Sequence, residues 1–244
     1  MILAYIVIFT LVGSVFSLAG GFLLVLKKKI TGGFSNNLIS FAAGALLGVA
    51  FLDLFPEALE EAEELNVFIP TLIGFVSFFL AERYIRIFHH HHEHGKKPTI
   101  PLILIGDGVH NFIDGVVITV AFLASIPLGI TTSLAVATHE IPQEIADMGV
   151  LLASGLSRSK AILYNFLSAI TSLVGALIAF YFAGFVEQYL YVFLAIAAGH
   201  FIYIASADLI PEIHENVSEN KLAQTLIFLL GIFSIYLFKR VFEG

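Results

Sequence analysis

Two stretches in the middle of the chain carry histidine and acidic side chains within otherwise apolar sequence. They read GDGVHNFIDG and THEIPQEIAD. His110 and Asp114 in the first stretch are four residues apart, as are His139 and Gln143 in the second, so each pair shares one face of a helix. Imidazole nitrogen together with carboxylate or amide oxygen suits zinc, iron(II), manganese or cadmium better than calcium or magnesium. The two stretches therefore predict a transition-metal site between two helices.

The charge balance of this region also indicates a bound cation. An ionised carboxylate inside a lipid bilayer costs several kcal/mol or more unless it is paired, solvated or bound to a cation. Residues 99–153 contain several acids but no lysine or arginine. Pro142 cannot donate a hydrogen bond to the Thr138 carbonyl, which favours a loosened backbone beside His139. The candidate metal ligands, for one ion or two, are His110, Asn111, Asp114, His139, Glu140, Gln143 and Glu144.

The composition is typical of an integral membrane protein. Of 244 residues, 58% are hydrophobic and 13% are charged, whereas roughly a quarter of the residues in a soluble domain are charged. The net charge of −7 argues against nucleic acid as a partner. There is no cysteine, so metal ligands must be nitrogen or oxygen. We expect the lipid bilayer and a divalent metal ion as partners and no organic cofactor, with a homodimer left open.

Apolar runs long enough to cross a bilayer occur eight times. We therefore predict an all-α fold, a single transmembrane domain over residues 1–244. Lysine and arginine gather after the first, third and fifth runs, which by the positive-inside rule leaves both termini outside the cell membrane. The predicted spans are 2–26, 37–56, 67–87, 99–123, 127–153, 160–184, 188–211 and 222–240.

An internal repeat relates the second and seventh predicted spans. AAGALLGVAFLDLFPEALEE and AAGHFIYIASADLIPEIHEN align at an offset of 155 residues, which pairs Asp53 with Asp208 and Pro56 with Pro211. Copies five spans apart cross the membrane in opposite senses, and inverted repeats of this kind are typical of transporters that work by alternating access. We expect spans 1–3 and 6–8 to surround a central unit of spans 4 and 5. The expected pathway residues are Asp53, Asp107, Asp147, His200, Asp208 and Glu212.

Small residues in this repeat, Gly44 and Gly199 among them, favour close helix packing, and we expect the central unit to slide along these surfaces.

A histidine-rich segment, residues 88–98, lies between the third and fourth predicted spans. Clustered histidines bind transition metals with modest specificity, so we interpret the segment as a cytoplasmic metal-collecting loop. An unstructured spacer is the alternative. The histidines concerned are His89, His90, His91, His92 and His94.

GDGVHNFIDG and HEIPQEIAD resemble the fourth and fifth transmembrane signatures of the ZIP family of divalent metal-ion transporters. The resemblance is to the subgroup whose fifth span carries H-E-x-P-H-E-x-x-D, and it extends over nearly the whole chain. It implies uptake of divalent transition metal, zinc foremost, into the cytoplasm.

Carried over position by position, the resemblance makes His110, Asp114, His139 and Gln143 the primary site, with Asn111 and Glu140 in an adjacent second site. The chain departs from the subgroup at Gln143, where the motif has histidine, which puts zinc selectivity over Fe²⁺, Mn²⁺ or Cd²⁺ in question. The sixth predicted span offers only Asn165 and Ser168 to a second ion.

Two other function classes are open from the residues alone. H-E-I-P-Q resembles the H-E-x-x-H motif of zinc proteases, so an intramembrane metalloprotease is the alternative function, although the second histidine is missing. A metal sensor without transport is the other. The inverted repeat and the H-N-x-x-D spacing favour a transporter and not an enzyme.

Overall fold

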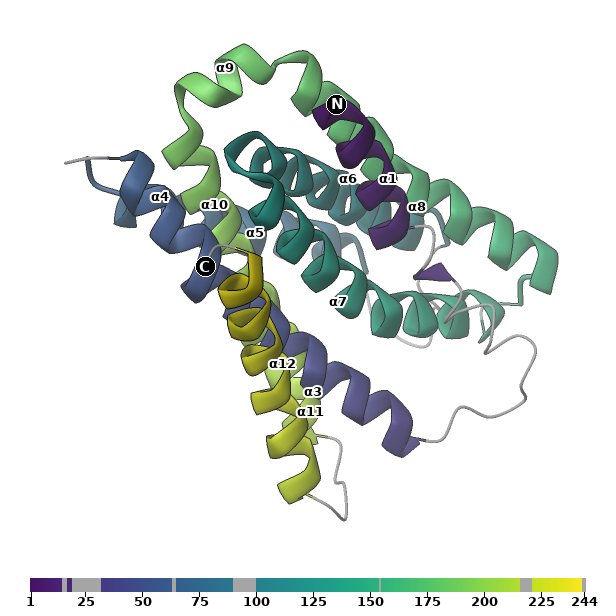
Figure 1. Cartoon of the computed structure of the whole chain (residues 1–244). Helices are drawn as coiled ribbons and strands as arrows, with labels where there is room; N and C mark the ends of the chain where they lie inside the picture. Colours follow the sequence, from purple (N-terminus) through teal and green to yellow (C-terminus); the bar gives the residue numbers. More distant parts are fainter. Residues whose placement is uncertain are drawn as a thin grey trace.

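The computed structural model describes residues 1–14, 17–18, 32–62, 65–89, 100–153, 155–215 and 221–242. This part of the chain is helical and contains no strand (Figure 1). The helices are α1 (Ile2–Ser14), α3 (Gly32–Val49), α4 (Phe55–Glu61), α5 (Phe68–His89), α6 (Ile100–Ala124), α7 (Ile126–Ala153), α8 (Arg158–Tyr181), α9 (Ala183–Gln188), α10 (Leu190–Tyr203), α11 (Ile210–Glu215) and α12 (Lys221–Phe242), with π-helical turns η1 (Ala50–Leu54) and η2 (Ile204–Leu209).

Within the described residues, five helical stretches are long and apolar enough to cross a membrane. They are Asn36–Glu61, Leu104–Ala124, Arg158–Tyr181, Leu190–His214 and Lys221–Val241. The outer face of α12 is apolar, and its exposed residues include Leu222, Leu226, Leu229, Leu230, Phe233 and Leu237. An apolar face of this extent is stable against lipid and not against water. The protein is therefore an integral membrane protein.

Several helix ends differ from the predicted spans. The acidic segment after the second predicted span was expected to be a loop, but the helix continues through η1 and α4 to Glu61. The seventh span likewise continues to Glu215, and α9 occupies the predicted loop after the sixth. A helix that has already formed extends readily, because each added residue forms one more backbone hydrogen bond. Helix α7 remains one α-helix through Pro142. Of the first predicted span, α1 covers only the beginning, and most of residues 15–31 lie outside the described residues.

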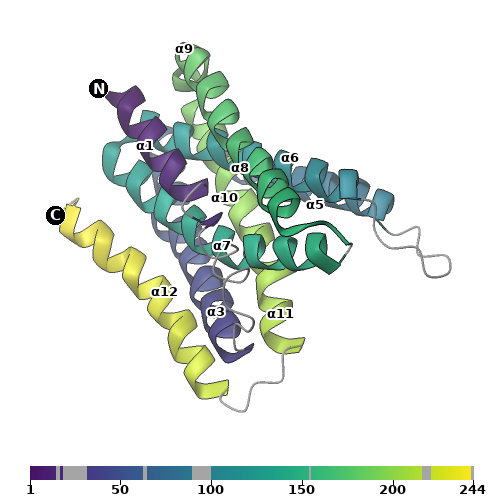
Figure 2. The same cartoon turned by 90° about the vertical axis from the view of Figure 1, so that its right-hand side faces the viewer.

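The helices pack in two groups. Helices α1, α6, α7 and α8 contact one another, while α3 packs along α12 and α5 along α10 (Figures 1 and 2). The two groups meet mainly where α3 contacts α7 and where α5 and α10 contact α6. The expected central unit of two helices is thus part of a group of four.

Glycines determine which helices pair. Each of three close contacts has a glycine on both helices, placed where an added Cβ would overlap a backbone carbonyl oxygen of the other helix. Without a Cβ, the two backbones approach closely and gain dispersion contacts. The pairs are Gly115 with Gly175 between α6 and α8, Gly44 with Gly231 between α3 and α12, and Gly74 with Gly199 between α5 and α10.

This packing corrects the expectation that Gly44 and Gly199 lie on a sliding surface beside the fourth and fifth spans. Gly44 faces Phe228 of α12, and Gly199 faces Thr71 of α5. Both contacts lie within one group of helices. A bulky substitution at either glycine would separate a helix pair, so it would disturb folding and not only movement.

The two segments aligned by the repeat have the same local structure. In η1 the Phe55 N–H donates to the Ala50 carbonyl, and in η2 the Ile210 N–H donates to the Ala205 carbonyl, each bond spanning five residues. These bonds coincide at the offset of 155, and a proline lies two residues after the end of each turn. Single π-helical turns of this kind occur frequently at functional sites.

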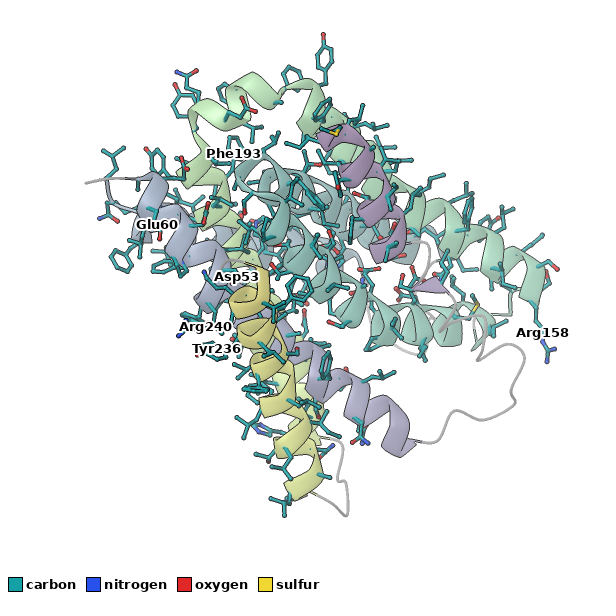
Figure 3. The ribbon with its side chains drawn as sticks, in the orientation of Figure 1. Asp53, Glu60, Arg158, Phe193, Tyr236 and Arg240 are labelled. Carbon is teal, nitrogen blue, oxygen red and sulfur yellow. The ribbon has the colours of Figure 1, made fainter. Side chains whose placement is uncertain are left out.

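Helix α12 stabilises the first of these turns. Pro56 has no N–H to donate to the Leu52 carbonyl, and Lys239 Nζ donates to that oxygen at 2.7 Å. The same ammonium lies 3.6 Å from Asp53 Oδ1, and the side chain of Asp53 is only 1% exposed. Figure 3 shows Asp53 beside the last turns of α12, near Tyr236 and Arg240. Asp53, expected on the metal pathway, is thus ion-paired to the end of α12.

We expect Lys239→Met to lower the free energy of unfolding by about 1.5–3 kcal/mol, the range for hydrogen bonds to charged groups. The measurement is thermal unfolding in detergent. The matched control is Arg240→Met, because Arg240 is exposed and contacts only the neighbouring exposed Tyr236, over whose ring it lies at 5.9 Å and to whose hydroxyl it donates at 3.3 Å, so its loss should change stability by less than about 0.5 kcal/mol. Equal effects of the two substitutions would contradict this role of Lys239.

Candidate metal centre

The two polar stretches lie on neighbouring antiparallel helices. Helices α6 and α7 are joined at Ser125 alone, so they form a hairpin whose middle turns face each other. His110 and Asp114 lie one turn apart on α6, and His139 and Glu140 lie on the facing turn of α7. Each of these four residues offers one ligand atom, and the four atoms lie within 4.8 Å of one another. They form the only such cluster of three or more His, Asp or Glu residues in the part of the chain that the structure describes.

The distances within this cluster match a tetrahedral site. The two Nε2 atoms are 3.2 Å apart. His139 Nε2 lies 3.3 Å from Asp114 Oδ2 and 3.6 Å from Glu140 Oε1, and His110 Nε2 lies 3.6 Å and 3.4 Å from the same two oxygens. A tetrahedron with metal–ligand bonds of about 2.1 Å has edges of about 3.4 Å. Five of the six distances among the four atoms are therefore close to those expected around a zinc-sized ion.

The surrounding protein holds these ligands in place. His139 Nδ1 lies 3.2 Å from the Ala135 carbonyl, which can only accept a hydrogen bond, so Nδ1 carries the proton and the Nε2 lone pair faces the cluster. The side chains of Asp114, His139 and Glu140 are 3%, 1% and 1% exposed, and that of His110 is 13% exposed. The cluster is therefore shielded, with its remaining access on the side of His110.

A second polar layer lies beside the cluster. Asp107 Oδ1 accepts a hydrogen bond from Asn111 Nδ2 at 3.0 Å and another from Gln143 Nε2 at 3.3 Å. Glu144 accepts a hydrogen bond from Asn165 Nδ2 of α8. Each of these amides donates an N–H to a buried carboxylate and so satisfies part of its hydrogen-bonding capacity. Asn111, Gln143 and Glu144 are thus hydrogen-bonded to residues outside the four-residue cluster.

This arrangement differs from the expected division of the site. Gln143 was expected in the primary site, and its amide nitrogen is instead bonded to Asp107. Glu140 was expected in the adjacent second site and lies with the two histidines. The sequence spacing allows either residue to lie with the two histidines, since Glu140 follows His139 directly and Gln143 is one helical turn away.

Glu140→Gln should lower zinc affinity at least about 100-fold, because even outer-shell substitutions cost about 10–100-fold. Gln143→Ala should lower it by no more than about 10-fold. Competition against a chelator of known affinity measures both constants, with circular dichroism as the check on folding. The reverse order would return Gln143 to the first coordination shell and contradict the role given to Glu140.

The expected pathway residues lie on several different helices. Asp147 lies one turn beyond Gln143 on α7, Asp208 lies in η2 and Glu212 lies exposed on α11. His200 of α10 is partly buried and contacts Phe78 of α5. Of the histidine-rich segment 88–98, residues 90–98 lie outside the described residues, and only the backbone of Phe88 and His89 is described, at the end of α5.

Sequence reasoning missed the side chains that contact the cluster from other helices. Phe78 packs edge-on against His110 at 5.4 Å between ring centroids, and Phe201 packs against His139 at 6.3 Å. The chain has 24 phenylalanines, and the sequence does not show which of them contact the cluster.

Comparisons with known proteins show the family to which this chain belongs. The sequence profile described as "ZIP Zinc transporter" matches residues 2–101 and 99–239. The chain belongs to the ZIP zinc transporter family. Members of this family are transporters and not enzymes, and nothing in these comparisons supports the alternative of an intramembrane protease.

Individual relatives are similar over parts of their length. The chain is 42% identical over 148 residues to "Zinc transporter foi" of Drosophila melanogaster, which covers 59% of this chain and 20% of the fly protein. It is 39% identical over 135 residues to "Zinc transporter ZIP10" of Danio rerio, covering 55% and 16%. It is 28% identical over 274 residues to "Zinc transporter zipt-7.1" of Caenorhabditis briggsae, covering 84% and 70%. The chain thus spans a fifth or less of the first two relatives.

Proposed function

We propose that this protein transports divalent transition-metal ions, zinc foremost, across a membrane, and that His110, Asp114, His139 and Glu140 bind the ion in transit. The observation that carries the proposal is the set of five distances of 3.2–3.6 Å among four facing ligand atoms. A tetrahedron around zinc has six edges of about 3.4 Å, and these five distances are close to that length. The names of the relatives and of the family support zinc as the substrate.

The charge of the site supports a divalent ion. Two neutral imidazoles and two carboxylates carry a charge of −2, and neither α6 nor α7 contains a lysine or arginine. A dication would balance the buried carboxylates, whose ionised form is otherwise unfavourable within a membrane. Iron(II), manganese and cadmium accept the same ligand types, so they are the expected competitors.

The proposed topology has eight spans with both termini outside the cell membrane. Helices α5 and α7 then cross the membrane together with the five more apolar stretches and the span that begins with α1. The shared π-helical turns of η1 and η2 support an inverted relation between the two halves. With this orientation, the lysine and arginine residues after the first, third and fifth spans face the cytoplasm, and zinc enters the cell.

Alternating access would move the four-helix group that contains α6 and α7 against the group that contains α3, α5, α10 and α12. All four proposed ligands belong to the first group. Movement of this group as a unit would carry the ion without breaking its coordination. Paired glycines bring the helices within each group into close backbone contact. Movement between the groups is therefore favoured over movement within them.

The test is zinc entry into liposomes that contain the purified protein, recorded with a fluorescent zinc indicator inside. Protein-dependent entry, competed by cadmium and iron(II) more strongly than by magnesium, is the expected result. Liposomes without protein are the control for leakage. Stoichiometric zinc binding without entry of any metal would overturn transport and leave a metal-sensing protein.

A further inference from the structure

We propose that His200 is a second, transient ligand for the transported ion, separated from the four-residue cluster by the ring of Phe78. The proposal rests on the proposed function, because it describes where the ion goes when it leaves the cluster. It concerns a histidine on the other group of helices. The ion would pass from His110 on α6 to His200 on α10 when Phe78 on α5 turns aside.

The ring of Phe78 contacts both histidines. Its ring centroid is 5.4 Å from that of His110 and 5.3 Å from that of His200. The phenylalanine side chain is 6% exposed, and His110 is the most exposed member of the cluster. An apolar ring at this position separates two ligands that would otherwise face each other through a polar path. Rotation about its side-chain bonds is the smallest movement that would connect them.

The hydrogen bonds around His200 leave one nitrogen ready to bind a cation. Ser77 Oγ donates its single hydrogen to the Gly74 carbonyl at 2.9 Å, so toward His200 Nε2, at 3.2 Å, it can only accept. Nε2 therefore carries the proton, and Nδ1 carries the lone pair. Nδ1 is buried and has no hydrogen-bond partner among the described residues. An imidazole that donates from one nitrogen to the protein and offers the other is the usual arrangement of a metal-binding histidine.

The face of α5 that carries Phe78 continues away from the cluster with an acid. Glu82 lies four residues after Phe78 on the same face, and it accepts a hydrogen bond from Tyr203 of α10. Tyr203 in turn packs against Phe78 at 5.6 Å between ring centroids. Phe78 and Glu82 thus lead along α5 from the cluster toward the end of α5 that carries arginine, and His200 lies beside Phe78. This end leads into the histidine-rich segment.

The first test compares His200→Leu with His214→Leu, an exposed histidine on α11. We expect His200→Leu to slow zinc entry into liposomes about 10-fold or more, because even the loss of an outer-shell contact costs about 10–100-fold in affinity or activity, and His214→Leu to leave it unchanged. The visible spectrum of cobalt(II) bound at the cluster should stay tetrahedral and unshifted in both. Entry at the wild-type rate in His200→Leu, or a changed cobalt spectrum, would overturn the proposal. Absence of entry in the wild type would instead overturn the proposed function.

The second test uses the absence of cysteine from the sequence. His200→Cys introduces a single thiol, so alkylation by a water-soluble maleimide reports on this position alone. When zinc is present at ten times its dissociation constant for this position, about one thiol in ten is left without zinc. Because only the unoccupied thiol reacts, alkylation should be about 10-fold slower. The control, Ser234→Cys on α12, should show no zinc protection. Alkylation of His200→Cys that is independent of zinc would contradict a ligand at position 200.

The third test concerns the separating ring. Phe78→Ala should raise the rate of zinc entry, since the barrier between the two histidines is removed, while Phe79→Ala, on the neighbouring more exposed ring, should not. Slower entry in Phe78→Ala with an unchanged cobalt spectrum would show that the ring assists the ion and does not separate the histidines.

Discussion

His139→Ala should abolish zinc entry into liposomes and lower zinc affinity at least about 100-fold, because the loss of a direct ligand exceeds the 10–100-fold cost of losing an outer-shell contact. His139 Nε2 contacts all three other members of the cluster within 3.6 Å, and its orientation is fixed by the Ala135 carbonyl. No other single side chain has both properties. The measurement is the initial rate of entry at matched amounts of incorporated protein, together with the affinity from chelator competition.

The control for His139→Ala is His214→Ala, which removes an exposed imidazole from α11. It should leave both quantities unchanged. Thermal unfolding in detergent separates loss of the ligand from loss of the fold. A folded His139→Ala protein that transports zinc at the wild-type rate would show that the ion takes another path.

Gly115→Ala should destabilise the protein by at least the upper end of the about 1–3 kcal/mol found for overpacking. Gly115 follows the ligand Asp114, and a Cβ here would overlap the Ser172 carbonyl oxygen of α8. Backbone cannot yield as a flexible side chain can, so α6 and α8 must separate. We expect a lower unfolding temperature in detergent and weaker zinc binding, because Asp114 moves with the helix.

Gly108→Ala is the matched control on the same helix. Its Cβ would lie 3.7 Å from Ser168 Oγ, an ordinary contact distance. This substitution should be neutral or stabilising, since alanine favours helix over glycine by about 0.5–1 kcal/mol. If Gly108→Ala and Gly115→Ala behave alike, the close approach of α6 and α8 does not determine stability.

The sequence was sufficient for much of the helical architecture because lipid leaves the backbone few alternatives. Apolar runs of spanning length locate most helices, and the four-residue spacing of His110 and Asp114 places both on one face. The helix ends were less predictable. Glu57 to Glu61 were expected in a loop because of their charge, and they are helical because η1 carries the helix up to Pro56.

The composition of the cluster could be predicted only in part. Glu140 and Gln143 both lie near His139, and which of them faces His110 depends on the rotation of α7 about its axis. That rotation is set by contacts with α3 and α8, far away in the sequence. The same holds for the pairing of helices, since Gly115 and Gly175 are 60 residues apart and nothing local connects them.

The central claim is that two imidazoles and two carboxylates bind the transported ion in a tetrahedron. X-ray absorption at the zinc edge tests it most directly, on protein loaded with one zinc and with the histidines of residues 89–94 replaced by alanine. We predict four nitrogen or oxygen neighbours at about 2.0–2.1 Å, with the scattering signature of two imidazoles in the parent and one in His139→Ala. A shell of six oxygens, or an imidazole signal that His139→Ala leaves unchanged, would contradict the account.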